Sequence, residues 1–283
     1  MKTETSRRGF LGAAAGLAGL AAGAPGASAA IEPEPWGIKL GVASYSLRRF
    51  TRAQAIEMVK ALQTPWISLK DMHMPFDSTP EQFKAARAEY EAAGIRIMSA
   101  GNTDMTKAAT TEALRRYFDY ARNAGIPMLV CAPTRENIKL VEQLVKEYNI
   151  PIAIHNHGPE DKVFPTPQSV LEVVRNLDPR CGLCMDVGHS ARAGADVVAS
   201  IAEAGSRLLD MHVKDLRSFT PNGQQVDVGD GIMPFPGIFK QLKKINYRGC
   251  VNLEYEINET NPMPGMQRSF SYMRGVLAGL AAA

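Results

Sequence analysis

The feature that most constrains this chain is a regular alternation of short apolar segments with longer amphipathic ones, from residue 38 to the C-terminus. A short apolar run predicts a buried strand, and a longer amphipathic stretch predicts a helix. The expected strands are 38–43, 66–70, 95–100, 127–131, 150–155, 181–187, 208–213 and 250–254. The expected helices are 53–62, 80–93, 111–123, 135–148, 168–176, 196–204, 235–244 and 266–280.

The eight strand–helix units favour one fold class. Strands that are apolar throughout, each followed by a helix, indicate a parallel sheet covered on both faces. Eight units of about thirty residues predict an α/β fold, a single-domain (β/α)8 TIM barrel. An open doubly wound sheet is the alternative. Such sheets normally carry a glycine-rich phosphate loop after their first strand, where this chain reads Ala-Ser-Tyr-Ser-Leu-Arg over residues 43–48.

The first 29 residues differ in composition from the rest. The pair Arg7-Arg8 precedes a run of Ala, Gly and Leu that ends in Ala27-Ser28-Ala29. This pattern is typical of a cleavable export signal, and the paired arginines resemble the twin-arginine type. We therefore expect residues 1–29 to be a signal peptide, residues 30–283 to be the barrel domain, and the mature protein to be periplasmic or exported. A membrane anchor is the alternative, but the run is short and weakly apolar, and we expect no stable membrane insertion after cleavage.

The charge balance bears on the partner. With 32 Lys and Arg against 29 Asp and Glu, the chain carries a formal charge of +3, too little for a strongly basic nucleic-acid face. Four cysteines in a chain of this length cannot form a disulfide scaffold. Cys181 and Cys184 point to opposite faces of a strand, and we expect buried thiols there. A small-molecule partner is favoured, and a monomer and a homo-oligomer are both compatible with the sequence.

Polar residues gather where the expected strands end. In a (β/α)8 barrel the active site lies at the carboxyl ends of the strands. The chain has five histidines, and all of them lie at or near such ends. They are His73, His155, His157, His189 and His212. A single buried histidine is more often structural, but five at one predicted rim favour a functional site.

A divalent cation is the cofactor that this rim predicts. His155, Asp186, His212 and Glu254 come from four successive expected strands and offer imidazole and carboxylate ligands. That mixture suits Mn, Co, Mg or Zn better than calcium. Because no local motif joins the four residues, the expectation depends on the fold being a barrel.

Five segments carry a resemblance to a known family. They are residues 154–158, 185–189, 211–215, 229–231 and 251–254, which read IHNHG, MDVGH, MHVKD, GDG and VNLE. With them the mature chain resembles the xylose isomerase-like barrel superfamily of sugar phosphate isomerases and epimerases, which includes ketose 3-epimerases, inosose dehydratase and endonuclease IV. The resemblance implies that Asp186, His212 and Glu254 bind a metal and that His189 contacts substrate hydroxyls.

His155 departs from the family pattern, because epimerases of the family usually have a glutamate in this strand. Ketose 3-epimerases use two glutamates to remove and return one proton, so the symmetric mechanism is not expected here. Imidazole remains an acceptable metal ligand. A reaction with one base, such as elimination next to a carbonyl, fits the remaining groups better.

Our working hypothesis is a metal-dependent sugar isomerase or epimerase that removes a proton next to a carbonyl, with the metal stabilising an enediolate. Glu254, a metal ligand, is also a candidate proton relay. The other candidates are Lys70 and His73 as acid or base, Lys214 and Arg217 as groups that neutralise developing charge, and His157 and His189 as substrate contacts. For Lys70 and Lys214 the alternative is a structural ion pair with a rim carboxylate such as Asp71 or Asp215.

Other functions stay open from sequence. A metal-dependent lyase or dehydratase acting on keto-sugars or keto-glycosides follows from His155. A non-catalytic periplasmic sugar-binding protein would have no need of Lys70 and His73 as proton-transfer groups. DNA repair of the endonuclease IV type is disfavoured by the low charge and by the export signal. Export also argues against phosphorylated sugars and favours free sugars, glycosides or their keto forms.

Overall fold

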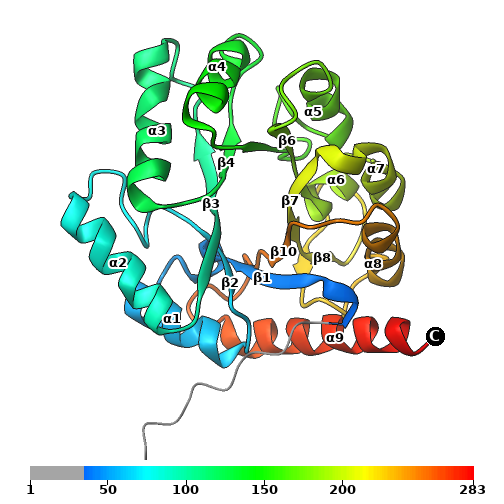
Figure 1. Cartoon of the computed structure of the whole chain (residues 1–283). Coiled ribbons are helices and arrows are strands. Elements are labelled where there is room, and N and C mark those ends of the chain that lie inside the picture. The colour runs from blue at the N-terminus through cyan, green and yellow to red at the C-terminus, as the bar shows by residue number, and fades with distance from the viewer. Residues whose placement is uncertain (1–34) are drawn as a thin grey trace, which may run out of the picture. The chain divides into compact units, whose positions relative to one another are not determined.

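Eight parallel strands close into a barrel, which confirms the predicted fold class (Figure 1). The structure is a computed structural model that describes residues 35–283, so the expected signal peptide, residues 1–29, lies outside the described residues. Around the barrel the strands run β1-β2-β3-β4-β5-β6-β7-β10, and β10 pairs with β1. Their bounds are β1 Lys39–Ala43, β2 Trp66–Leu69, β3 Arg96–Asp104, β4 Leu129–Ala132, β5 Ile152–His155, β6 Cys181–Asp186, β7 Leu208–Val213 and β10 Cys250–Leu253.

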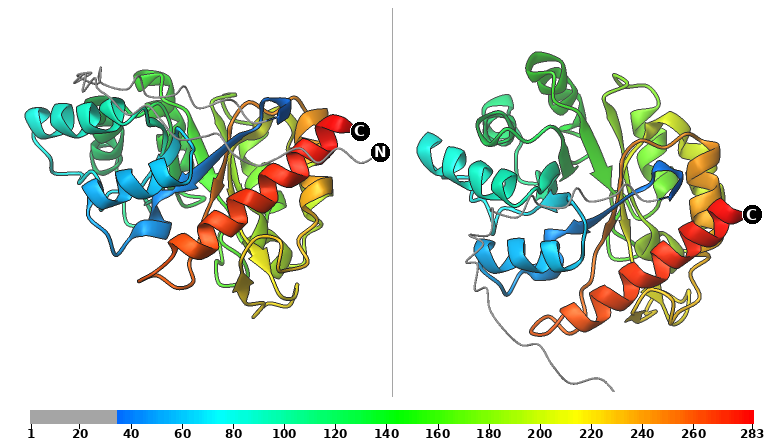
Figure 2. Two further views of the ribbon diagram at one scale, coloured as in Figure 1. Left: turned by 90° about the horizontal axis from the view of Figure 1, so that it is seen from below. Right: turned by 60° about the horizontal axis from the view of Figure 1, so that its bottom comes forward.

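Helices surround the strands, and the long helix α9 runs along the outside of the barrel (Figure 2). The helices are α1 Arg52–Ala61, α2 Pro80–Ala92, α3 Thr111–Ala124, α4 Ile138–Tyr148, α5 Pro167–Val174, α6 Val187–Arg192, α7 Val197–Ala204, α8 Phe235–Lys244 and α9 Met263–Ala282. Short 3₁₀ turns occupy Pro35–Gly37, Ser44–Leu47 and Gly205–Arg207. None of these described helices is both long enough and apolar enough to cross a membrane.

Local sequence sets the helix boundaries. At the start of α2, Thr79 accepts a hydrogen bond from the backbone N–H of Gln82, and Pro80 occupies the first turn, where a missing N–H costs nothing. At the end of α3, Gly125 takes a left-handed conformation with φ of 66°, which glycine adopts without strain. The predicted helix starts at 80 and 111 therefore coincide with the observed ones.

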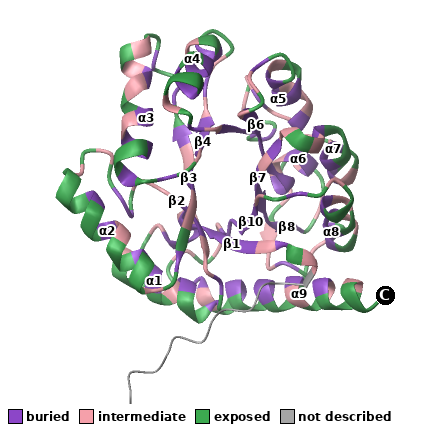
Figure 3. Cartoon of the chain, viewed as in Figure 1, coloured by how far each residue is buried: buried purple, intermediate pink, exposed green. Residues whose placement is uncertain are grey.

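The core lies between the helices and the barrel. Helix faces turned toward the strands are buried and the outward faces are exposed (Figure 3). In α3, for example, Leu114, Phe118 and Ala121 are buried at helical spacing. Cys181 and Cys184 are buried free thiols, as predicted. Burial of apolar side chains thus stabilises the barrel. The strands in turn position the polar residues at its carboxyl end.

Two elements near the site differ from the sequence prediction. Strand β3 runs four residues beyond residue 100, and its register with β4 shifts between Ala100 and Thr103, which is a β-bulge. Helix α6 begins directly at the end of β6, where no helix was expected. Asp186 caps this helix, because its Oδ1 accepts a hydrogen bond of 2.8 Å from the His189 N–H.

A hairpin also occupies the segment between β7 and α8, in which no element was expected. It pairs β8, Asp215–Leu216, with β9, Gln225–Val226, in antiparallel fashion. The Asp215 carboxylate accepts hydrogen bonds of 2.9 Å from the backbone N–H groups of Gly229 and Met233. These bonds fold the chain after the hairpin back onto β8.

Candidate active site

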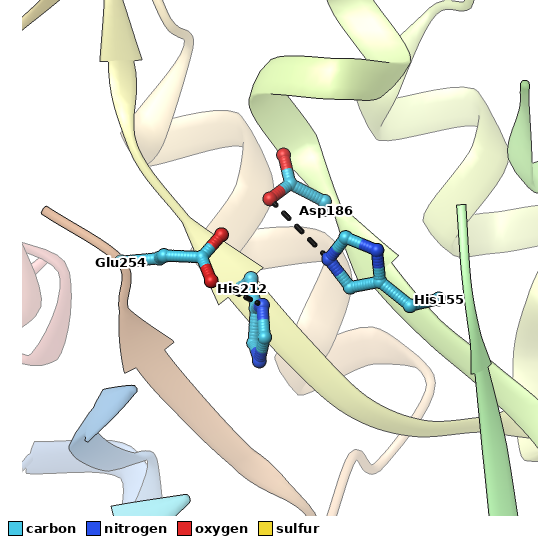
Figure 4. A group of neighbouring side chains, drawn as sticks. All are labelled: His155, Asp186, His212 and Glu254. Carbon is cyan, nitrogen blue, oxygen red and sulfur yellow. Dashed lines mark ion pairs between the residues drawn. The ribbon is translucent and has the colours of Figure 1, made fainter. Parts of the chain in front are cut away.

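Four side chains converge at the carboxyl end of the barrel (Figure 4). His155 ends β5, Asp186 ends β6, His212 lies in β7, and Glu254 directly follows β10. One ligand atom from each lies within 4.8 Å of the others. His155 Nε2 is 3.7 Å from Asp186 Oδ2, and His212 Nδ1 is 3.4 Å from Glu254 Oε1. The structure therefore brings together the four residues that the sequence predicts as metal ligands.

The donor atoms of this cluster fit a divalent cation. Two ligands bound about 2.1 Å from one ion lie roughly 3.0 to 3.5 Å apart at octahedral or tetrahedral angles, close to the two separations given above. The ring nitrogens of His155 and His212 are buried and have no hydrogen-bond partner among the described residues. Buried polar atoms without a partner are costly. Coordination of a cation would satisfy them, and the donor set suits Mn, Co, Mg or Zn.

Lys214 balances part of the negative charge at this site. Its ammonium group lies 3.2 Å from Asp186 Oδ2 and 2.8 Å from Glu254 Oε2, and it also contacts the Glu256 carboxylate. Burial opposes ionisation of Asp186 and Glu254, but the nearby Lys214 charge holds the pKa of each below its ordinary value. One lysine among three carboxylates leaves two negative charges, which a divalent cation would neutralise.

The pKa values of the two buried imidazoles are shifted in opposite directions. Burial lowers the pKa of His155, which favours the neutral form that binds metals. Burial also opposes a charge on His212, but the adjoining Cys184 and Glu254 raise the pKa of His212 well above its ordinary value. A cation held by His212 would have to displace a proton, so the affinity of the site for a cation would fall as the pH is lowered.

Three members of the cluster, His155, His212 and Glu254, line a pocket of about 230 Å³. Because pockets for drug-sized ligands start at about 300 Å³, this volume suits a molecule of monosaccharide size. His157 and His189, the two histidines predicted to contact substrate, line the pocket with their ring centroids 4.5 Å apart. Burial lowers the pKa of His189 to about 3. Its neutral ring can both donate to and accept from a sugar hydroxyl.

Lys70 lines the same pocket from the end of β2. Its ammonium group donates to the backbone carbonyl of Asn102 and lies 3.8 Å from Asp71 Oδ1. The structure thus contains the alternative ion pair with Asp71, at a long distance, and also keeps the side chain 26% exposed. Lys70 remains within reach of a pocket ligand.

Two predicted catalytic or binding groups lie away from the pocket. His73 is buried, and its Nε2 is 3.1 Å from the carbonyl oxygen of Phe50. The turn after β2, in which the His73 N–H bonds to the Lys70 carbonyl, directs the ring toward the loop after β1, so His73 joins two loops. Arg217 is exposed in the hairpin segment after β8 and does not line the pocket. Neither placement supports the predicted contact with substrate.

Lys214 takes the structural alternative, an ion pair with carboxylates of the rim, although its partners do not include Asp71 or Asp215. It is buried against three carboxylates and is not among the residues lining the described pocket. Asp215 is occupied by backbone N–H groups of its own loop. The position of Lys214 supports a role in holding the charged ligand side chains Asp186 and Glu254 in place.

Sequence reasoning missed three residues at the site. Glu256 lines the pocket and pairs with Lys214. It lies two residues after Glu254 on an extended segment, and this spacing, which places both side chains on one face, is the sequence signal that could have identified it. Asn102 lines the pocket from the bulge in β3. Gln225 donates to the Glu254 carbonyl at 2.7 Å and accepts from the Glu256 N–H at 3.0 Å, so it holds the backbone beside both carboxylates. No pattern marks a glutamine in a loop for this role.

Comparison with known proteins agrees with this fold. Residues 53–276 match the model of the xylose isomerase-like TIM barrel family, and the chain belongs to that family. The crystal structure of 3-keto-D-glucoside 4-epimerase, YcjR, from E. coli superposes with a TM-score of 0.69 over 84% of this chain and 99% of that one, at 13% identity. At that identity the likeness shows the fold alone.

Curated relatives match only part of the chain. Rhizopine catabolism protein MocC of Rhizobium meliloti is 30% identical over 146 residues, 46% of this chain and 44% of that protein. Inosose dehydratase of Mesomycoplasma hyopneumoniae (strain 7448) is 29% identical over 153 residues, 47% of this chain and 50% of that protein. The matches thus span about half the length of these relatives or less.

Proposed function

We propose that the protein is a divalent-metal-dependent enzyme that isomerises or epimerises a sugar or keto-sugar by removing a proton from the carbon next to a carbonyl. The observation that carries the proposal is the convergence of four candidate ligand side chains, two of them imidazoles without a hydrogen bond, beside a pocket of about 230 Å³ that also exposes Lys70. The relative named inosose dehydratase supports the same class of substrate.

The residues divide the work as follows. His155, Asp186, His212 and Glu254 would hold the cation, which as a Lewis acid stabilises negative charge developing on substrate oxygens. Lys70 Nζ is the candidate group that takes or returns the proton, since it lies in the pocket and away from the ligand cluster. His157 and His189 bind hydroxyl groups of the sugar.

A second candidate function is a lyase or dehydratase that uses the same proton removal and then expels a hydroxyl or glycosidic oxygen. The observation in its favour is His155, a buried imidazole with a lowered pKa at the position where a second carboxylate base would be needed for two-sided proton return. The inosose dehydratase relatives also support it. The two candidates share the first step and differ in whether the product has lost a leaving group.

Proton exchange with solvent tests the shared step. In D₂O the metal-loaded protein is expected to catalyse incorporation of one deuterium next to the carbonyl of at least one test substrate. The test substrates are a ketose such as D-fructose or D-xylulose, an inosose and a 3-keto-glucoside, and mass spectrometry of the recovered sugar measures the deuterium. Chelation should abolish exchange, and Mn, Co, Mg or Zn should restore it. Lys70→Met should slow exchange at least about 100-fold without loss of metal, whereas the exposed-site control Lys60→Met should not.

Each result of that experiment has a meaning. Exchange without loss of a group supports the isomerase, and exchange with loss of water or of an aglycone supports the lyase. Binding of these sugars with no exchange by any of them contradicts both enzymes and supports the sugar-binding protein.

We also propose that the folded protein is exported by the twin-arginine route, on the strength of Arg7 and Arg8 before an apolar run. Cells expressing the full chain are expected to hold it in the periplasmic fraction at a shorter mass. A variant with Arg7→Lys and Arg8→Lys should accumulate in the cytoplasm at full length. The same distribution of the native chain and the double variant between periplasm and cytoplasm would contradict this proposal.

A further inference from the structure

The pocket has a second wall, which faces the ligand cluster across the barrel. Around the closed sheet, β2 and β3 lie opposite β6 and β7, which carry Asp186 and His212. The carboxyl ends of β2 and β3 contribute Ser68, Lys70, Gly101 and Asn102 to the lining. A sugar whose carbonyl end lies at the cluster therefore extends toward this wall.

The bulge in β3 shapes this wall. In a regular strand, neighbouring residues point to opposite faces, yet the consecutive residues Gly101 and Asn102 both line the pocket. The register with β4 shifts between Ala100 and Thr103, so the strand gains an extra residue at this point. Bulges beside active sites commonly redirect a side chain. Here the bulge places Asn102 in the lining beside Gly101.

One atom of the Asn102 carboxamide, Oδ1, has no hydrogen-bond partner within the described part of the chain. This atom is buried and accepts no hydrogen bond, although the backbone carbonyl of Asn102 accepts one from Lys70. A buried amide group left unpaired costs about 1–3 kcal/mol, and such groups are rare in folded proteins. Because Oδ1 is closed to solvent, a ligand hydroxyl reaches it only after the side chain rotates toward the pocket that Asn102 lines. There the hydroxyl can donate to or accept from the carboxamide in either orientation of the amide.

The charges around this wall do not suit a phosphate. The Lys70 ammonium is engaged by the Asn102 carbonyl and lies near Asp71. The next cations are paired as well, Lys214 with three carboxylates and Arg192 with Glu160. The Glu256 carboxylate adds a negative charge to the lining. A dianion would meet a carboxylate and one lysine that already has partners, rather than the cluster of free cations that recognises phosphate.

We propose that the wall around Asn102, beside Lys70, is a subsite for the hydroxyl groups of an uncharged sugar, with Asn102 as a residue that determines specificity. The subsite rests on the proposed function, because it binds the part of the substrate that does not react. Asn102 reads a hydroxyl by hydrogen bonding, and phosphate esters of the same sugar are excluded by charge.

Equilibrium binding tests the subsite without requiring turnover. Calorimetric titrations of the Mn-loaded protein would compare D-fructose, D-xylulose and D-ribulose, each beside its phosphate ester. At least one free ketose should bind, and at least about tenfold more tightly than its ester. Asn102→Ala should weaken binding of that ketose about 5- to 10-fold with Mn affinity unchanged, whereas Asn222→Ala, at an exposed position in the hairpin loop, should leave both unchanged.

Monodeoxy ketoses separate hydroxyl recognition from a general packing effect. The native chain should discriminate against the analogue that lacks the hydroxyl bound by Asn102, and Asn102→Ala should lose that discrimination. Tighter binding of an ester, binding of no ketose, or unchanged discrimination in Asn102→Ala overturns the subsite. If the native chain catalyses deuterium exchange but Asn102→Ala keeps the native binding specificity, the subsite alone is overturned. If Asn102→Ala weakens sugar binding as expected but the native chain catalyses no exchange, the proposed reaction alone is overturned.

Discussion

Replacing Asp186 with asparagine is expected to remove tight divalent-cation binding and to lower proton-exchange activity by at least about 100-fold. Asparagine has nearly the same size and can still accept the hydrogen bond from the His189 N–H that starts α6. The change therefore removes one charge and one anionic ligand while the local fold is kept. Metal content after dialysis and the exchange rate in D₂O measure the two effects.

The chain offers a matched control in Asp196→Asn. Asp196 also caps a helix, α7, by accepting from the Ala199 N–H at 2.9 Å, but it is exposed and contributes nothing to the ligand cluster. We expect this variant to keep its metal and its activity. Stoichiometric metal and native exchange in Asp186→Asn would show that the cluster is not the cation site. Equal losses in both variants would point to helix capping as the cause.

Much of the fold could be predicted because its strands are apolar throughout and each is followed by a helical period. The expected strand 208–213 and the expected helix 235–244 coincide with β7 and α8. The bulge in β3 could not be predicted, since residues 101–104 carry no period that distinguishes a strand from a loop. The same holds for the hairpin of β8 and β9, whose two-residue strands are stabilised by side-chain contacts to distant segments.

The candidate site could be predicted where the residue lies on a strand. His155, Asp186, His212 and Glu254 end or adjoin four strands of the barrel, and parallel strands bring their carboxyl ends together. His73 follows a tight turn rather than a strand, and that turn, which sequence spacing does not reveal, carries its ring to Phe50. Residues after a strand end are therefore placed by loop geometry, which depends on tertiary contacts.

Lys214→Met is expected to lower the free energy of unfolding of the metal-free protein by about 3–5 kcal/mol at neutral pH, the usual effect of removing one partner from a buried ionic group. Methionine keeps much of the volume but leaves Asp186 and Glu254 buried without their counter-ion. A bound divalent cation takes up part of that negative charge, so the loss should be smaller in the loaded protein. Urea unfolding with and without Mn measures the difference.

The pH dependence has a definite sign. Lys214 depresses the folded-state pKa of Asp186 and Glu254, and a depressed carboxyl pKa adds stability above the unfolded pKa of about 4 and loses it as the pH falls through the folded value. The raised pKa of Lys214 itself adds stability that is fully present below about 10.4 and is lost only as the pH rises through the folded value. The difference in free energy of unfolding between the native protein and Lys214→Met should therefore be largest near pH 7 and should become smaller below pH 4.

A matched lysine separates the two roles open to Lys214. Lys60 pairs with Glu57 at 2.9 Å but is 46% exposed, so Lys60→Met should cost less than about 1 kcal/mol. If Lys214→Met lowers the free energy of unfolding no more than Lys60→Met does and yet abolishes deuterium exchange, Lys214 acts on the substrate, as its position after β7 first suggests. If it costs several times more and exchange recovers with saturating cation, Lys214 serves to hold the charged ligands together, because only that role can be replaced by another positive charge at the same site.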